Sequence, residues 1–247
     1  MDKINLLFGE PLILGNLVFR HPTVNEILEV GEDFYHSCIN IFTLRPYDMM
    51  VDLYDSGIDY EKMENYDLFV LMCGETLKEK NGKVFINKES NISKSLEWLT
   101  GIPDFFLCSK KDEFFLYSKK TGLKIDKAIY YSVHKYFIDM MFIEDKDEFN
   151  PGNATTKKFL IEQKRKELKR KAKKKNNQFA SNISSLVWSS GITFEEVKKL
   201  HIYQLNDGLH RINKLKNYEH VCIGYFTGHI ESSAFRKMQE DLNWMNN

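Results

Sequence analysis

The chain has 247 residues, of which 43% are hydrophobic and 28% are charged, values that are ordinary for a globular protein. Only 13 Gly and 5 Pro occur, which favours helices over a sandwich with many turns. The 35 basic and 35 acidic residues cancel, and this neutrality argues against a protein that coats nucleic acid with its whole surface. The 4 cysteines are far apart, so neither a zinc site nor a disulfide framework is expected.

Hydropathy bears on where the protein works. The chain has no uninterrupted apolar segment of about 18 residues, the length that a membrane span needs. The apolar run after Met1 is also too short for a signal peptide. We therefore expect a protein of the reducing cytoplasm that has no membrane partner.

Residues 1–148 predict a helical domain that contains one β-hairpin. An extended lead-in is expected over residues 1–20, followed by a helix that Thr23 and Glu26 open as a capping box and that reaches Phe42. Apolar runs on both sides of a polar turn predict the hairpin near 105–117. The other expected elements are a short strand at 83–87 and helices at 47–55, 65–80, 93–99 and 126–142.

The strongest local feature is a basic run inside a predicted linker helix at 149–178. Asn150-Pro151-Gly152-Asn153 marks the boundary, and Thr155 or Thr156 is expected to cap the helix. Between Lys157 and Lys175 the chain holds 11 Lys or Arg and 2 Glu, and apolar residues beyond Ile161 are too few to bury a face. The helix is therefore expected to be solvated or bound to a partner. Its candidate partner-binding residues are Lys164, Arg165, Lys169, Arg170 and Lys173.

Residues 179–247 predict a small helical C-terminal region. Trp188 ends an apolar stretch, and Thr193 with Glu196 forms a second capping box. The next helix carries apolar residues at intervals of three and four, namely Leu205, Leu209, Ile212 and Leu215. The fold class that these patterns predict is mainly α, or α+β at most, with a helical N-terminal domain, a basic linker helix and a helical C-terminal region.

No catalytic, cofactor or metal site is expected. The histidines at 201, 210, 220 and 229 are nine or ten residues apart, so neighbours on a continuous helix face opposite sides. Asp48, Asp52 and Asp55 fall on roughly one helical face, a pattern compatible with magnesium binding or acid–base chemistry. The exposed face of an amphipathic helix is the commoner meaning of such a pattern. We therefore predict a binding protein and no enzyme.

Three segments whose apolar residues have helical spacing occur together in this chain. The first is residues 49–72, which follow Arg45-Pro46-Tyr47, and the second is residues 153–169. The third is residues 184–212, with Tyr225-Phe226-Thr227-Gly228 and Leu242-Asn243-Trp244 after it. This combination resembles phage tail assembly chaperones of low-GC Gram-positive phages or prophages, although many such chaperones are shorter.

The resemblance implies a protein that binds the tape-measure protein while tail tube subunits polymerise around it, in the cytoplasm of the infected bacterial host. Apolar side chains such as Phe105, Phe106 and Trp188 are candidates for holding the client. Two alternatives remain open. One is a structural tail or baseplate component that stays in the virion, and the other is a nucleic-acid-binding accessory protein that uses the basic run 164–175.

Overall fold

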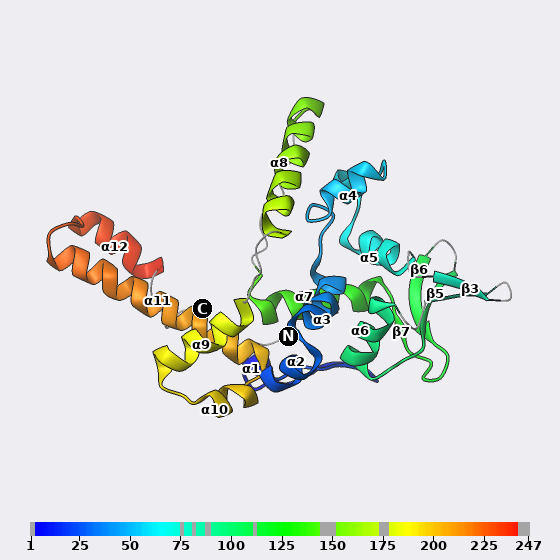
Figure 1. The fold of residues 1–247 in the computed structure, drawn as a ribbon, viewed down its shortest axis with the longest axis horizontal. Helices are drawn as coiled ribbons and strands as arrows, with labels where there is room; N and C mark the ends of the chain where they lie inside the picture. Colours follow the sequence, from blue (N-terminus) through cyan, green and yellow to red (C-terminus); the bar gives the residue numbers. More distant parts are fainter. Residues whose placement is uncertain are drawn as a thin grey trace.

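The protein is mainly helical, as the sequence predicts. The computed structural model describes residues 3–74, 77–80, 83–86, 90–110, 113–143, 152–172 and 178–241. None of the helices in these ranges is long and apolar enough to cross a bilayer. Figure 1 shows a body that contains α3 (Glu32–Thr43) and α7 (Lys127–Met141) and a helix α8 (Ala154–Ala172) that stands out from it. An arm extends on another side and consists of α12 (Ser232–Asp241) and the distal half of α11 (Ile202–Phe226).

The chain begins with a short helix where the sequence indicated an extended lead-in. Helix α1 (Lys3–Leu7) buries Leu6 and is only five residues long, too short for its apolar spacing to be recognised as helical. The extended part of the prediction is confirmed for β1 (Leu12–Leu14) and β2 (Leu17–Phe19), which pair antiparallel. Gly15 lies in the tight turn between them at φ 62°.

A capping box opens the next helix, as predicted. The Glu26 N–H donates to Thr23 Oγ1 at 3.3 Å, and the Thr23 N–H donates to Glu26 Oε2 at 2.7 Å. The single helix expected here is in fact two, α2 (Val24–Val30) and α3, which meet at Gly31. Gly31 has a φ of 91°, a conformation that Gly reaches without a Cβ clash, and this residue redirects the chain.

Two short helices and a longer one follow, and here part of the prediction was wrong. They are α4 (Met50–Asp55), the 3-10 helix η1 (Tyr60–Lys62) and α5 (Asn65–Gly74). The expected helix 65–80 ends early because residues 77–80 form β3 (Leu77–Lys80), the partner of β4 (Lys83–Ile86). Strand β4 confirms the predicted strand at 83–87, while the turn signal Asn81-Gly82 lies outside the described residues.

The predicted hairpin near 105–117 is confirmed and carries a third strand. Helix α6 (Asn91–Thr100) precedes it, and β5 (Phe105–Lys110), β6 (Glu113–Ser118) and β7 (Lys124–Ile125) form an antiparallel sheet in that order. Asp126 then caps α7, and its carboxylate accepts from the Ile129 N–H at 3.1 Å. The sequence predicted one hairpin, whereas the described residues also contain the pairs β1–β2 and β3–β4.

Aromatic rings fill the centre of the body. Phe42 stacks on Phe69 with 5.5 Å between ring centroids, and it lies 5.7 Å from Phe137 and 6.1 Å from Tyr130. These four residues come from α3, α5 and α7, so three helices meet in one cluster. Large buried rings supply much of the apolar area that stabilises a core of this kind.

Helix α8 has a different cap from the one predicted. The Asn153 side-chain oxygen accepts from the Thr156 N–H at 2.8 Å, which is the usual bond of an N-terminal cap. The prediction that Thr155 or Thr156 caps the helix was therefore wrong. The predicted end near Asn176 lies outside the described residues.

The C-terminal helices share the main core with the N-terminal ones. They are α9 (Gln178–Ser190), α10 (Phe194–Lys199) and α11, and the predicted capping box of Thr193 with Glu196 is confirmed at the start of α10. The Val24 N–H donates to the Leu200 carbonyl at 2.9 Å, which ties α2 to the chain between α10 and α11. Their side chains in the main core include Phe179, Leu186, Val197, Ile202 and Leu205.

Candidate functional site

The basic residues of α8 divide into two groups. Arg165 faces the body, where its guanidinium donates two hydrogen bonds to Asp55, at 3.0 and 2.9 Å. Lys164 is half-buried, whereas Lys169 and Arg170 are exposed. Lys173 lies outside the described residues. Within the basic run, Arg165 thus forms an ion pair with the body of the molecule, while the exposed residues remain candidates for binding an external partner.

Phe105 and Phe106 point to opposite sides of β5. Phe105 is only 5% exposed and belongs to the main core, so it is not part of an open surface in this structure. Phe106 is half-buried, 5.7 Å from the Tyr117 ring across the strand pair, and the Lys119 ammonium lies 5.4 Å from its ring. The alternation of side chains along a strand explains why one ring is inside and its neighbour is not.

Trp188 is 81% exposed, near the end of α9. The neighbouring Ser189 accepts a hydrogen bond from Lys216 at 3.3 Å, which places this end of α9 beside the middle of α11. One turn earlier, Leu186 packs over Gly208 of α11, where an added Cβ would lie 3.1 Å from Leu186 Cδ1. Helix α9 therefore covers the first half of one face of α11.

The same face of α11 continues uncovered beyond α9. Ile223 and Phe226 are 59% and 81% exposed, and Leu215 is an exposed large apolar residue about two turns before Ile223. At about 100° per residue these three positions fall within one side of the helix. We call Leu215, Ile223 and Phe226 the α11 stripe. Nothing in the sequence distinguished them from core positions, because their spacing continues that of Leu205 and Leu209.

Helix α12 packs against the other side of the distal half of α11. The Tyr225 and Phe235 rings stack with 4.4 Å between centroids, and Ile230 lies over Gly224. Figure 1 shows α12 and the distal half of α11 as an arm that extends away from the body. The arm thus holds the α11 stripe clear of the core.

The histidines and acidic residues do not assemble a metal centre in the parts of the chain that the structure describes. His201 lies at the start of α11, where its Nδ1 is 2.8 Å from the His21 carbonyl oxygen. Asp48 accepts from the Arg45 guanidinium at 3.1 Å, and Asp55 is paired with Arg165. The aspartates that share a face in the sequence thus have different partners in the fold.

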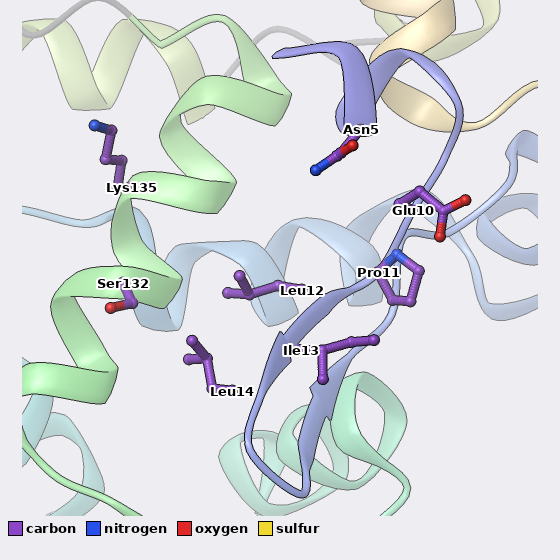
Figure 2. A pocket seen from close by; sticks show the side chains of 8 residues that line it. All are labelled: Asn5, Glu10, Pro11, Leu12, Ile13, Leu14, Ser132 and Lys135. Carbon is purple, nitrogen blue, oxygen red and sulfur yellow. The ribbon is translucent and has the colours of Figure 1, made fainter. Parts of the chain in front are cut away.

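A hollow of about 610 Å³ opens between the N-terminal segment and α7. Figure 2 shows Leu12 and Leu14 on one wall, with Ser132 and Lys135 of α7 opposite and Glu10 at the rim. Both charged residues are exposed. Exposed large apolar side chains also occur on α9 and α11, in the C-terminal helices.

Comparison with known families adds one finding. Residues 171–247 match the family described as the YomV second domain, and this range contains α9 to α12 with Trp188 and the α11 stripe. The match indicates a phage- or prophage-related protein family. No curated protein and no solved structure matches the chain.

Proposed function

We propose that this protein is a phage tail assembly chaperone that binds the tape-measure protein through apolar contacts, without catalysis. The observation that carries the proposal is the α11 stripe together with Trp188. These side chains are exposed on helices within the segment that matches a phage-related family. Contiguous patches of exposed apolar side chains mark protein interaction sites, and Leu215, Ile223 and Phe226 share one side of α11.

The geometry suits a helical client. An amphipathic helix binds by laying its apolar side chains, spaced by three or four residues, against a complementary apolar surface. Ile223 and Phe226 are themselves three residues apart, and the end of α9 lies about two turns before Ile223. A long apolar helix of the tape-measure protein therefore has a row of contacts along this arm. We place this activity in the cytoplasm of the infected host, before tail tube subunits enclose the client.

The test is co-expression of the tape-measure protein with three forms of the chain. These are the wild type, a variant with Trp188→Ser, Ile223→Ser and Phe226→Ser, and the control Phe159→Ser. Phe159 is 60% exposed on α8 and lies outside the proposed surface, so the control removes a comparable ring. We expect the wild type and the control to bring the client into the soluble fraction and co-elute with it. The triple variant should bind the client about tenfold more weakly, a loss of about 1.4 kcal/mol of binding free energy, and should leave most of the client insoluble.

Two outcomes would contradict the proposal. If the wild type neither solubilises nor co-elutes with the tape-measure protein, the chaperone function is excluded. If the protein remains in purified virions at a fixed ratio to the tube subunit, it is a structural tail or baseplate component.

A second candidate function is supported by the outward side of α8. Lys166, Lys169 and Arg170 are exposed there and are available to neutralise phosphates. This function predicts binding to duplex DNA that weakens steeply with salt. Replacing all three residues by Ala should reduce the slope of log K against log salt by about 0.9 for each phosphate that is no longer neutralised. Absence of DNA binding at low salt excludes it.

A further inference from the structure

Helix α8 is attached to the body by one side only. Lys157, Ile161 and Arg165 are four residues apart, which puts them on the same helical face. Of the described side chains of α8, Ile161 is the buried one, at 1% exposure. Helix α7, by contrast, buries five side chains in the main core. The apolar contact that holds α8 is therefore small.

The charged residues on this face of α8 lie against a short acidic segment, residues 55–61. Lys157 Nζ donates to Asp59 at 2.6 Å and to Glu61 at 2.9 Å, and it lies 4.7 Å from the centre of the Tyr60 ring. Arg165 makes its two hydrogen bonds to Asp55, at the end of α4. These bonds lower the pKa of Asp55 and of Asp59, because the nearby cations favour the charged carboxylates.

The surface beneath α8 is a second hydrophobic cluster, which touches the main core through Met72. Met50 is buried in it beside Ile161, and Met49, Met63 and Met72 pack against it. Four of the nine methionines of the chain thus lie in this cluster. Methionine side chains are flexible and polarisable, and they are over-used at surfaces that accept more than one partner. We call this cluster, together with Asp55, Asp59 and Glu61, the α4–η1 surface.

We propose that the α4–η1 surface is a binding site for an external amphipathic helix, and that α8 is its internal occupant. The occupant that the surface fits carries an aliphatic residue with Lys or Arg four positions before and four positions after it. Two observations support this. The acidic side chains are complementary to those two charges, and the exposed ion pair of Arg165 with Asp55 contributes little against a competitor. This site is separate from the α11 stripe, so it stands whether or not the stripe binds the tape-measure protein.

The experiment measures exchange of α8 on the full-length chain. The probe is a fluorescent peptide with the sequence of residues 153–172, and its control is the same peptide with Ile161→Asp. A chain with Lys157→Glu and Arg165→Glu, which we call the released chain, is designed to detach its own α8 by placing like charges against Asp55, Asp59 and Glu61. The matched control chain has Lys166→Glu and Arg170→Glu, which make the same charge change on the side of α8 away from Ile161. Circular dichroism and thermal melting confirm that each chain is folded.

We expect the released chain to bind the probe about tenfold more tightly than the wild type, as measured by fluorescence anisotropy. The matched control chain should bind like the wild type, and the Ile161→Asp peptide should bind to neither. Adding Asp55→Lys and Asp59→Lys to the released chain should return its affinity for the probe to the wild-type value. If the glutamate variants fail to fold, Lys157→Gln with Arg165→Gln replaces them. This chain should likewise bind the probe more tightly than the wild type and the matched control chain.

Three results would overturn the proposal. The first is a released chain, shown to be folded, that does not bind the probe. The second is binding that the reversal of Asp55 and Asp59 leaves unchanged. The third is a wild-type dimer in light scattering that dissociates with Asp55→Lys, because this would assign the surface to α8 of a second copy.

Discussion

The Nδ1 atom of His201 lies 2.8 Å from the carbonyl oxygen of His21, and the two imidazole rings are 5.0 Å apart between centroids. The Tyr203 N–H donates to His21 Nε2 at 3.3 Å. That nitrogen accepts a hydrogen bond only when it carries no proton. The pair therefore joins the first turn of α11 to the segment before α2, and the junction depends on a neutral His21.

The first prediction is a loss of stability in mild acid. Burial, followed by the nearby His201, lowers the pKa of His21 to about 4 from 6.5. Between pH 6.5 and 4 His21 is protonated in the unfolded chain but neutral in the folded chain. The contribution of His21 to the free energy of unfolding is therefore fully present above pH 6.5 and is lost as the pH falls towards 4. The loss from this residue amounts to about 3 kcal/mol.

Urea unfolding at a series of pH values measures this effect. The control is His21→Gln, because the Gln side-chain oxygen also accepts from an N–H but does not titrate in this range. The wild type should lose more stability than His21→Gln between pH 6.5 and 4. Parallel pH profiles for the two chains would show that His21 is not the responsible group.

The second prediction concerns the contact between Gly9 and the same junction. Gly9 has a φ of 74°, and an added Cβ would lie 2.1 Å from His201 Cδ2. Gly15 has a similar φ of 62° but open space around it, so Gly15→Ala has the backbone strain without the clash. We expect Gly9→Ala to destabilise the protein by about 1–3 kcal/mol more than Gly15→Ala in urea unfolding. Equal losses would mean that His201 moves aside without cost.

The parts of the fold that the sequence predicted well depend on short-range signals. Thr23 with Glu26 and Thr193 with Glu196 are three residues apart, and each pair starts a helix through its own side-chain bonds. Asp126 does the same for α7. These interactions are local, so their residue types and spacing are enough to recognise them. Strand β3 was missed because the apolar run in α5 continued to dominate the pattern.

The contacts that build the candidate surfaces could not be predicted in the same way. Arg165 and Asp55 are 110 residues apart, and His201 and His21 are 180 apart. The sequence shows that the chain contains Arg165 and many acidic residues, but it does not show which of these acidic residues pairs with Arg165. Likewise, the apolar spacing of α11 identifies one face, but only the fold shows that α9 covers its first half and leaves Ile223 open.

The third prediction separates the covered and open residues of α9. Leu186 is buried against Gly208, whereas Trp188 is exposed two residues later. Leu186→Ala should cost about 2–4 kcal/mol of unfolding free energy, because it leaves a cavity between α9 and α11. Trp188→Ala should change stability by less than about 0.5 kcal/mol. A large loss for Trp188→Ala in thermal or urea unfolding would mean that the indole is packed, which would remove it from the proposed client surface.

The fourth prediction is an order of cysteine reactivity. Cys38 and Cys73 are buried, and burial raises the pKa of Cys38 to about 11 and that of Cys73 to about 12. The thiolate is the reactive form, so neither should react with iodoacetamide near neutral pH while the chain is folded. Cys222, on the α11 arm, is half-buried and should be alkylated first.

Mass spectrometry of tryptic peptides after timed alkylation gives the modified fraction at each cysteine. Cys108 should follow Cys222, because partial burial raises its pKa. In urea all four should react at similar rates, which provides the control for intrinsic reactivity. Early alkylation of Cys73 in the absence of urea would show that α5 opens from the body, because this thiol is fully enclosed in the aromatic core. Slow alkylation of Cys222 would instead show that a partner or a second copy covers the arm.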